Sequence, residues 1–530
     1  MKRRLPIGIQ DFAKIREGAQ LYVDKTACVH RLISGGGGAF FLSRPRRFGK
    51  SLLCSTLEAV FEGRRQLFGE IAGFPALAIN SLEWEWEKYP VIRLDLNVGD
   101  YSRGTDFLDS TLSNALGNVA IRYNLQLRGN YASERFTNLI MDIHGQSGKQ
   151  VVVIIDEYDK PLLDTMTDAT LYKTVRDNLK GFYSVLKPSD RYLRFVFLTG
   201  VTKFSHVSIF SDLNHLTDLT LDRRYADICG ITQDELENTF GPEIESVLKE
   251  TGKGREEYLE DLRRFYNGYR LSKKPLRVYN PFGLLSHFET GEFSPYWYGT
   301  GTPTFLTKLI AGQKIDILSL SNMQVGDNDF SKYDIENMGA QPLLYQSGYL
   351  TIKDYDEESC LYTLDFPNAE VRSCFAGSLM EQYVQQSAQT AGSLSTHLLQ
   401  ALLKGNPDDA VLSLRHFFAA IPYDIIRDSE NYYQTAVHII FTMLGFNCRS
   451  EVRIASGRID TLVETKNFVY CFEFKLDKGS SRPHADEALA QIGSRDYLLP
   501  WKGSGKKLFK VGVCFDSEKR NIGEWKVAVQ

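Results

Sequence analysis

Residues 39–61 read AFFLSRPRRFGKSLLCSTLEAVF, and this stretch decides the fold of the first part of the chain. It begins with a short apolar run, turns through a loop that ends in Gly49, Lys50 and Ser51, and continues as a helix-like segment. In a strand, a turn ending in Gly-Lys-Ser and a helix, backbone N–H groups and the helix N-terminus surround phosphates. The stretch therefore predicts an ATP-binding loop in which Lys50 reaches the β- and γ-phosphates and Ser51 binds Mg²⁺.

The loop departs from the usual pattern at its first position, where Arg44 stands in place of a glycine. The missing glycine requires only another route into the turn, which Pro45 can supply. Arg46 or Arg47 can add positive charge beside the phosphates. We therefore expect nucleotide binding to survive. The alternative for the tripeptide taken alone is a chance Gly-Lys-Ser at a helix start.

A second motif, VVVIIDEYD (151–159), is an apolar run that ends in Asp156 and Glu157. Asp156 is predicted to hold Mg²⁺ and Glu157 to polarise the attacking water. A solvated loop is the alternative, but the upstream Gly-Lys-Ser argues against it. An adjacent Asp-Glu, with one strand inserted between the two motif strands, points to the P-loop ATPases with a catalytic glutamate. Thr199, which ends the next strand, is then the candidate γ-phosphate sensor, although such a threonine is commonly only a turn residue.

The chain predicts an α/β fold with three domains. Four short apolar runs separated by longer helical or mixed stretches suit a parallel sheet buried on both faces: 39–45, 89–96, 151–159 and 193–201. They predict a three-layer P-loop ATPase domain over 1–235. A capping box at Thr232 and Glu235 opens a helical middle region, 236–370. Residues 371–530 predict a second α/β unit, with its core at about 425–525.

Composition leaves the partners open. A chain of 530 residues is too long for one hydrophobic core. No apolar run is long enough to span a bilayer and the basic N-terminus lacks a signal-peptide core, so we expect no membrane partner and a cytoplasmic location. The eight cysteines form no CxxC pair or Cys/His cluster. A net charge of −4 gives no global attraction for nucleic acid.

A second candidate site lies in GRIDTLVETKNFVYCFEFKL (457–476). Glu473 and Lys475 are two apart on a strand and share a face, and a hairpin would place Asp460 across from Glu473. This pattern favours metal-dependent phosphodiester cleavage. Asp460 and Glu473, with the carbonyl of Phe474, would bind Mg²⁺ or Mn²⁺, while Lys475 orients the water or stabilises the phosphorane. The alternative is a surface hairpin with alternating charged residues.

With these motifs in place, the sequence resembles a known family: bacterial AAA-ATPase-like proteins joined to a PD-(D/E)XK nuclease domain, common in gut Bacteroidetes-type bacteria. The resemblance runs in order through nearly the whole chain. It rests on GIQDF with YVDKT (22–26), RPRRFGKS (44–51), IIDEYDKPL (154–162), FLTGVTKFS (197–205), YNGY (266–269), YNPF (279–282), YQSGYLTI (345–352) and FPNAEV (366–371). It implies that Arg44 is a family trait and that Asp24 and Lys25 lie near the nucleotide.

The C-terminal part of the resemblance matches the PD-(D/E)XK core residue by residue: Glu430, Asp460, Glu473, Lys475 and Gln491. It implies that Glu430, at the start of an amphipathic helix, is a further metal ligand and that Gln491 adds a contact. Glu451, just after that helix, competes with Glu430, although a charge at a strand edge explains it equally well.

These observations favour an ATP-regulated nuclease, with DNA preferred over RNA by family analogy alone. Such a protein would serve in defence or in the upkeep of mobile DNA. It could form a homo-oligomer, for which Arg223 or Arg224 is a candidate arginine finger. The alternative is a nucleotide-controlled signalling or oligomerisation switch whose C-terminal domain binds nucleic acid without cutting it.

Overall fold

The computed structural model divides the chain into two compact units, Met1–Gly301 with Gln324–Asn368, and Thr302–Met323 with Ala369–Gln530. The structure describes residues 3–35, 38–203, 215–301, 320, 323–327, 340–383, 388–419, 421, 429–444, 447–454, 456–479 and 484–530. The last two residues of the predicted motif FLTGVTKFS lie outside them. The division into three domains stays a prediction, and residues of its first two domains share one unit.

The first unit contains a parallel sheet of five strands in the order β2-β3-β4-β1-β5. Their bounds are β1 (Ala39–Ser43), β2 (Val91–Asp95), β3 (Val151–Asp156), β4 (Leu193–Gly200) and β5 (Leu216–Asp218). The first four confirm the apolar runs of the sequence, and β4 is the strand inserted between β1 and β3. The sequence did not predict β5, because three residues carry no pattern. All of β3 is buried, as expected for a strand covered on both faces.

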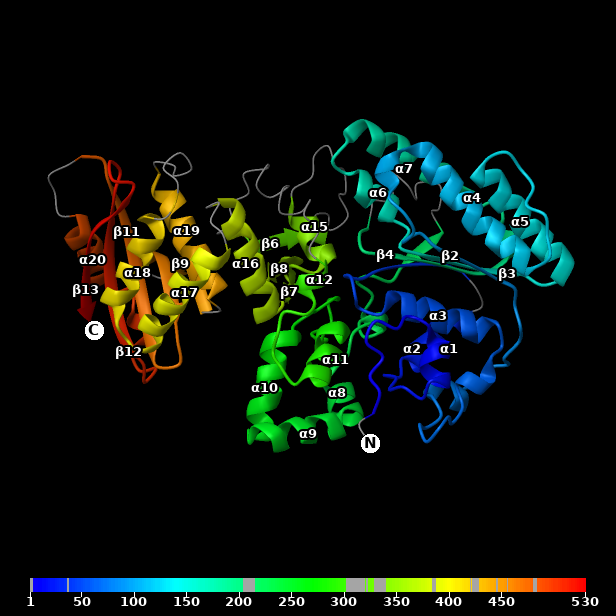
Figure 1. Ribbon diagram of the computed structural model, residues 1–530, viewed down its shortest axis with the longest axis horizontal. Coiled ribbons are helices and arrows are strands. Elements are labelled where there is room, and N and C mark those ends of the chain that lie inside the picture. The colour runs from blue at the N-terminus through cyan, green and yellow to red at the C-terminus, as the bar shows by residue number, and fades with distance from the viewer. Residues whose placement is uncertain are drawn as a thin grey trace. The chain divides into compact units, whose positions relative to one another are not determined.

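Helices cover both faces of this sheet, which confirms the three-layer prediction (Figure 1). Helices α4 to α7 lie on one face and α1 to α3 on the other. Their bounds are α1 (Phe12–Glu17), α2 (Thr26–Ile33), α3 (Lys50–Phe61), α4 (Thr105–Arg122), α5 (Ala132–Ser147), α6 (Lys160–Thr165) and α7 (Ala169–Ser184). The carboxyl ends of β1, β3 and β4 therefore meet at one edge, next to the start of α3.

The rest of the first unit is mainly helical, with a small sheet. Its elements are α8 (Gln233–Thr239), α9 (Gly241–Thr251), α10 (Arg255–Tyr266), α11 (Pro281–Thr290), α12 (Tyr298–Gly301), α15 (Ala340–Ser347), β6 (Met323–Gly326), β7 (Thr351–Asp356) and β8 (Leu361–Asp365). The predicted capping box of Thr232 and Glu235 opens α8. Leu236, Phe240 and Tyr266 belong to its hydrophobic core.

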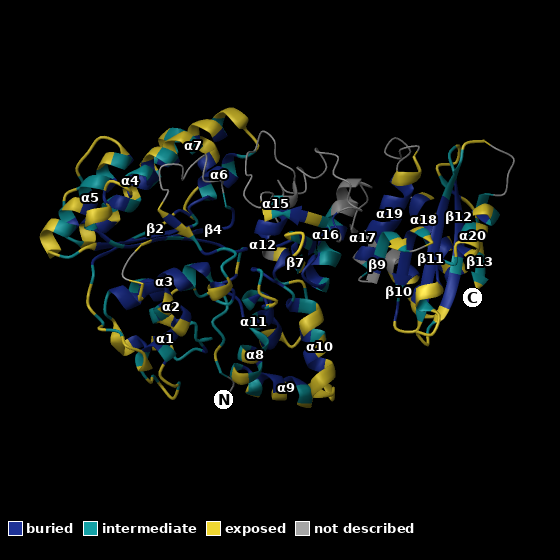
Figure 2. Cartoon of the chain, turned by 180° about the vertical axis from the view of Figure 1, so that it is seen from behind, coloured by how far each residue is buried: buried dark blue, intermediate teal, exposed yellow. Residues whose placement is uncertain are grey.

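The second unit contains a mixed sheet in the order β13-β12-β11-β10-β9, in which only β11 and β12 run parallel. Its elements are α16 (Ala369–Tyr383), α17 (Ala388–Leu403), α18 (Pro407–Ala419), α19 (Glu430–Met443), β9 (Asn447–Ile454), β10 (Gly457–Glu464), β11 (Phe468–Asp477), α20 (His484–Ser494), β12 (Lys507–Asp516) and β13 (Asn521–Val529). Strands β10, β11 and β12 are largely buried (Figure 2). The half-exposed edge strand β13 was not predicted, since its sequence lacks an apolar run.

Two further features concern the helices and the cysteines. Within the described ranges, no helix combines the length and the apolar character that a membrane crossing requires. All eight cysteines are free thiols, and six of them are buried.

Candidate active sites

The phosphate loop leads from β1 into α3, and Gly49 is its last residue. Gly49 has φ +92° and stands at the N-cap of α3, a conformation that other residues rarely adopt. Lys50 opens the helix and is only 3% exposed. Its Nζ lies 3.3 Å from the carbonyl oxygen of Pro45 and 3.2 Å from Oε1 of Glu157. Lys50 thus reaches from the loop to the acidic pair.

Arg44 explains how the loop begins without a glycine. Its guanidinium is buried and donates to the carbonyl oxygens of Ser43 (2.8 Å), Thr220 (2.9 Å) and Tyr225 (3.0 Å). Burial lowers the pKa of Arg44. The side chain therefore anchors the start of the loop to the segment after β5, and its charge is directed at main-chain carbonyls.

The next two arginines differ in their surroundings. The Arg47 guanidinium lies 3.9 Å from the centre of the Phe282 ring, and its backbone has φ +61°. Arg46 is half-buried, and its carbonyl oxygen accepts a hydrogen bond of 2.9 Å from Nε1 of Trp297. Within the part of the chain that the structure describes, the Arg46 guanidinium makes no hydrogen bond or ion pair. Arg46 is thus the freer of the two cations.

The acidic pair lies at the end of β3. Asp156 is fully buried, and burial raises the pKa of its carboxyl group to about 6; the charge of Glu157 adds to the rise and the neighbouring Ser51 side chain opposes it. Oδ1 of Asp156 accepts from the backbone N–H of Glu157 at 3.0 Å, whereas the buried Oδ2 makes no hydrogen bond. Glu157 has φ +51°, which is strained backbone for a non-glycine residue. A buried carboxylate with an unsatisfied oxygen fits a Mg²⁺ site.

Thr199 is fully buried at the end of β4, and its hydroxyl donates to the carbonyl oxygen of Leu42 in β1 at 2.8 Å. The hydroxyl thus forms a contact across the sheet. The role of Thr199 as γ-phosphate sensor stays a prediction.

An apolar cavity borders Gly49 and the first turn of α3. It is lined by the N-terminal segment, the loop and the helical region, including Leu21, Val23, Ile231 and Leu285. Its position beside the phosphate loop suits the base of a nucleotide.

The YVDKT motif holds one edge of this cavity. Lys25 lines it, and its Nζ is paired with Glu235 at 2.6 Å. Asp24 accepts hydrogen bonds from the backbone N–H groups of Thr26 (2.8 Å) and Ala78 (2.7 Å). Asp24 therefore shapes the segment, and Lys25 is the member of the pair that borders the cavity.

The helical region packs directly against the phosphate loop, which sequence reasoning missed. The Phe48 ring meets the Tyr269 ring edge-on at 4.7 Å. Gly348, at φ +91°, lies so close to the loop that a Cβ there would stand 2.7 Å from Cβ of Pro45. The motifs YNGY, YNPF and YQSGYLTI supply these contacts, and their aromatic and glycine residues were the available signal.

The second site is built on the hairpin β10–β11. The strands pair Thr461 with Phe472 and Glu464 with Val469, a register that places Asp460 opposite Glu473. Oδ2 of Asp460 accepts from the backbone N–H of Phe474 at 2.9 Å. The predicted hairpin therefore brings the two carboxylates together.

Burial dominates the electrostatics of this site. It raises the pKa of Asp460 to about 6 and that of Glu473 to about 7, with the charge of Asp460 adding to the rise at Glu473. Oε1 of Glu473 accepts a hydrogen bond from Nε2 of Gln491 and lies 3.5 Å from Nζ of Lys475. The buried Oε2 makes no hydrogen bond. Two carboxyls of raised pKa and one unsatisfied oxygen fit a divalent cation.

Two further glutamates border the hairpin. Glu430, the first residue of α19, raises the pKa of both Asp460 and Glu473 through its negative charge. Glu451 pairs with Arg458 at 2.5 Å. Glu451 also raises the pKa of Asp460, so both glutamates lie close enough to the hairpin to act on its charge, and the choice of Glu430 as a further ligand stays a prediction.

Gln434 is a residue that sequence reasoning missed. Its Nε2 donates to Oε1 of Glu451 (2.9 Å) and to the carbonyl oxygen of Asp460 (3.1 Å). It thereby holds α19 against β10. The described residues contain no group of three or more Asp, Glu, His or Cys side chains that could hold a metal ion. The predicted ligand set of Glu430, Asp460 and Glu473 accordingly stays a prediction.

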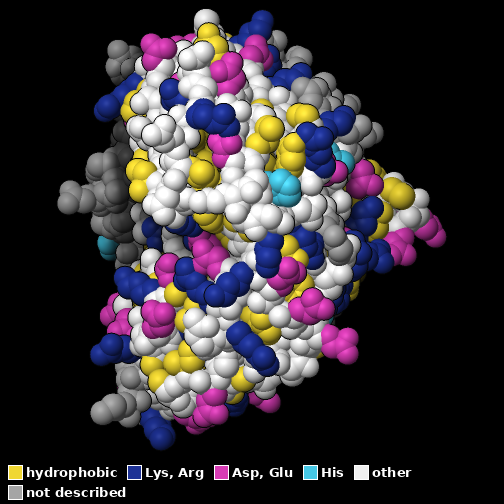
Figure 3. Space-filling view, turned by 90° about the vertical axis from the view of Figure 1, so that its right-hand side faces the viewer, with side chains coloured by type: hydrophobic (Ala, Val, Ile, Leu, Met, Phe, Trp, Pro, Cys, Tyr) yellow, Lys and Arg dark blue, Asp and Glu magenta, His cyan; other side chains and the backbone are white. Residues whose placement is uncertain are grey.

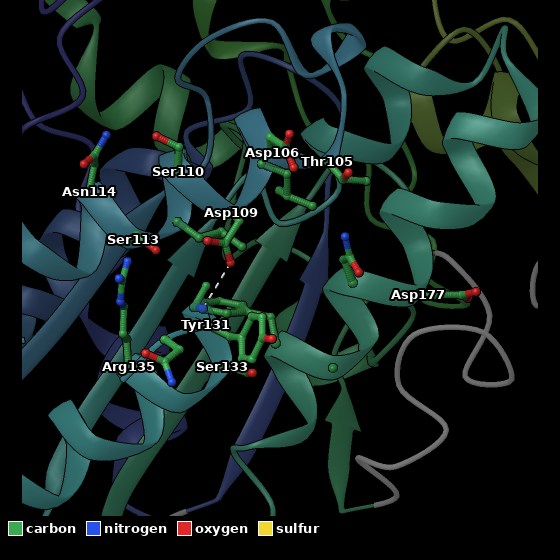
Figure 4. A pocket seen from close by; sticks show the side chains of 17 residues that line it. Thr105, Asp106, Asp109, Ser110, Ser113, Asn114, Tyr131, Ser133, Arg135 and Asp177 are labelled. Atoms are coloured by element: carbon green, nitrogen blue, oxygen red, sulfur yellow. Dashed lines mark hydrogen bonds between the residues drawn. The ribbon is translucent and has the colours of Figure 1, made fainter. Parts of the chain in front are cut away.

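Other surface features lie apart from these residues. A cavity of about 780 Å³ between α4, α5 and α7 is lined by Asp109, Ser113, Tyr131 and other polar residues, but by none of the predicted site residues (Figure 4). Among the described residues on the face seen in Figure 3, Lys and Arg side chains are interspersed with Asp and Glu side chains.

Comparisons with known proteins match the two regions of the chain that contain the candidate sites. A family model described as predicted AAA-ATPase (AAA-ATPase-like) matches residues 6–210, and one for the PD-(D/E)XK nuclease superfamily matches residues 428–525. An "Uncharacterized protein in vnfD 5'region" from Azotobacter chroococcum mcd 1 is 37% identical over 533 residues, which cover 98% of either chain. All candidate residues of the two sites lie inside the matched ranges.

Proposed function

The chain belongs to the family of AAA-ATPase-like proteins with a C-terminal PD-(D/E)XK nuclease domain, and from this premise we propose that it binds and hydrolyses ATP and uses that reaction to regulate metal-dependent cleavage of DNA. One observation carries the proposal. Each candidate site contains a buried carboxylate with an oxygen that makes no hydrogen bond, Oδ2 of Asp156 and Oε2 of Glu473. Buried carboxylates of this kind are stabilised by a bound cation or by a proton, and their raised pKa values reflect that missing partner.

In the first site, Lys50 and Ser51 would hold the phosphates and Mg²⁺, and Mg²⁺ would neutralise charge on the transferred phosphoryl group. Asp156 would hold the metal through its buried carboxylate. Glu157 acts as the base that orients the attacking water. Its carboxylate lies 3.2 Å from Nζ of Lys50, beside the phosphates that Lys50 would hold. Arg46 is the candidate for an additional phosphate contact.

In the second site, Asp460 and Glu473 would hold Mg²⁺ or Mn²⁺, which supplies Lewis-acid activation of the scissile phosphate. Lys475 shares the face of Glu473 and places its ammonium group 3.5 Å from Oε1. There it stabilises negative charge that develops on the phosphate. Gln491 fixes the orientation of the Glu473 carboxylate.

A nucleotide-controlled switch is the second candidate, and the packing around the phosphate loop favours it. Pro45 and Phe48 are buried against the helical region of the same unit, and the exposed Arg47 contacts its Phe282 ring. A nucleotide enclosed in this way would exchange slowly. Slow turnover with intact affinity would distinguish this switch from an active ATPase.

The remaining partners are proposed on weaker grounds. DNA is preferred over RNA by family analogy, with roles in defence or in mobile-DNA upkeep. Eight free thiols suit the reducing cytoplasm. For a homo-oligomer, Arg223 is the better arginine finger, since Arg224 is held by Asp222 at 2.6 Å whereas Arg223 makes only an exposed pair with Glu357 at 3.4 Å.

Cleavage of supercoiled DNA, linear DNA and single-stranded RNA with Mg²⁺ or Mn²⁺ tests the nuclease assignment. Lys475→Ala should lower cutting by about 10²-fold or more because it removes the charge beside the phosphate. Lys466→Ala, in the loop of the same hairpin, is the matched control and should cut like the wild type. If Lys475→Ala cuts as fast as the wild type, the hairpin does not take part in the cleavage reaction.

A further inference from the structure

Asp159 connects the acidic pair with the segment that follows β4. It is fully buried and lies three residues after Asp156. Its carboxylate accepts from the backbone N–H of Val201 (3.1 Å), the backbone N–H of Thr202 (2.6 Å) and the Thr202 hydroxyl. Every one of these donors lies just beyond the end of β4.

The two segments are closely packed and joined by several hydrogen bonds. A Cβ on Gly200 would stand 2.2 Å from Oδ1 of Asp159, so only glycine permits this approach. The Tyr158 hydroxyl donates to the carbonyl oxygen of Thr202 at 2.8 Å, and the Tyr158 backbone N–H donates to the carbonyl oxygen of Thr199 at 3.1 Å. The turn after β3 and the end of β4 therefore form one rigid block.

This block is tied to α15, whose end also contacts the phosphate loop. The backbone N–H of Lys203 donates to Oε1 of Gln346 at 2.7 Å, and Gln346 is 5% exposed. Two residues further along, Gly348 packs against Pro45 of the loop. The end of α15 thus touches both the block and the loop, through residues only two positions apart.

We propose that Asp159 and Gln346 are positioning residues that transmit a change at Glu157 to α15. The change then alters the contact between the end of α15 and the phosphate loop. The inference rests on the proposed ATPase function. In the structure, Lys50 lies 3.2 Å from Glu157. When phosphates draw Lys50 away, Glu157 loses this partner, and the block that contains Glu157 and Asp159 shifts its contact with Gln346. Because Lys50 reaches both the β- and the γ-phosphate, a triphosphate draws it further from Glu157 than a diphosphate does, and the middle region thereby distinguishes the two nucleotides.

The proposed path runs from Glu157 through Asp159 and Gln346 to the phosphate loop. Hydrogen exchange tests it with a readout other than activity. Backbone exchange over residues 342–352 is compared between a non-hydrolysable ATP analogue and ADP, each with Mg²⁺. In the wild type we expect exchange rates in this segment to differ by about threefold or more between the two nucleotides. Gln346→Met removes the acceptor and should abolish the difference, while Gln346→Glu keeps an acceptor oxygen and should retain it.

Thermal shift separates the two claims. If Gln346→Met still melts higher with either nucleotide but loses the exchange difference, the path is supported. If the difference persists in Gln346→Met, or is absent from a wild type that binds both nucleotides, the path is wrong and the ATPase proposal stands. If the wild type shows no thermal shift with either nucleotide, the ATPase proposal fails and the path fails with it. Asp159→Asn, which weakens the same path at its other end, should reproduce Gln346→Met.

Discussion

At the scale of single residues, the two sites share one physical principle. Both bury carboxylates whose charge the protein itself does not fully compensate. Asp156 and Glu473 each keep an oxygen without a hydrogen bond, although Lys50 and Lys475 stand nearby. Such a residue costs stability in the folded chain when it is charged, and a proton or a bound cation offsets that cost.

Lys50→Ala should abolish the rise in melting temperature that Mg²⁺ and ATP produce, since the side chain that reaches the phosphates is lost. The fold should be kept, because Lys50 lies at the mouth of the loop and not in the hydrophobic core. Lys249→Ala, on the exposed face of α9, is the control and should shift like the wild type. A full thermal shift in Lys50→Ala would place the nucleotide elsewhere.

Glu157→Gln should keep nucleotide binding and lower the rate of ATP hydrolysis by about 10²-fold, because an amide cannot accept the proton of the attacking water. Phosphate release and thermal shift are measured on the same preparation. Hydrolysis at the wild-type rate would exclude Glu157 as the base.

The nuclease site should respond to pH through Asp460 and Glu473. Their pKa values are raised to about 6 and about 7, so the folded, metal-free protein binds these protons more tightly than the unfolded chain. Their contribution to the free energy of unfolding therefore falls as the pH rises through 6 and 7. Over the same window the affinity for Mn²⁺ should rise, since the cation displaces the protons.

Calorimetric titration with Mn²⁺ checks this pH dependence. We expect binding to be at least about tenfold tighter at pH about 8 than at pH about 6. Glu473→Gln should weaken binding and flatten the pH dependence, because it removes the group with the higher pKa. Equal affinity at both pH values in the wild type would contradict the arrangement.

At the scale of elements, close packing between the middle region and the phosphate loop is the main finding. Gly348→Ala would force a Cβ to within 2.7 Å of Pro45, in a backbone at φ +91°. We expect a loss of about 1–3 kcal/mol in the free energy of unfolding, together with weaker ATP binding, since the loop must shift.

Gly145→Ala, near the end of α5, is the matched control, because a methyl group added there would meet no neighbouring atom within 4 Å. It should be neutral or stabilise the protein by up to about 1 kcal/mol. Denaturant unfolding and nucleotide titration of both variants compare the two effects. If Gly348→Ala binds ATP as tightly as Gly145→Ala, the contact between α15 and the loop does not matter for binding.

Local patterns explain which elements could be predicted. The buried run of β3 and the spacing of Asp460, Glu473 and Lys475 are encoded within one strand or one hairpin, so periodicity identifies them. In edge strand β13, buried and exposed residues do not alternate regularly, because the strand is half-exposed. Its sequence therefore lacks the periodic pattern that identifies a strand. Contacts between distant segments, such as Arg44 with the carbonyl of Tyr225, depend on the completed fold.

At the scale of the whole molecule, the sequence predicted two chemistries in one chain, and the family matches cover both. What a single sequence does not contain is the partnership of Asp159, Gly200 and Gln346, which are far apart in the chain and meet only after folding. Each of the two units has its own candidate site. What remains to be tested is whether nucleotide binding at the first site regulates cleavage at the second.

The rate of DNA cleavage with ATP, with ADP and without nucleotide, in wild type and in Lys50→Ala, tests that link most directly. We predict that ATP changes the wild-type rate, that ADP does not reproduce this change, and that Lys50→Ala cuts at one rate under all three conditions. Cutting by the wild type that is the same with ATP, with ADP and without nucleotide would contradict the claim that the phosphate loop governs the nuclease.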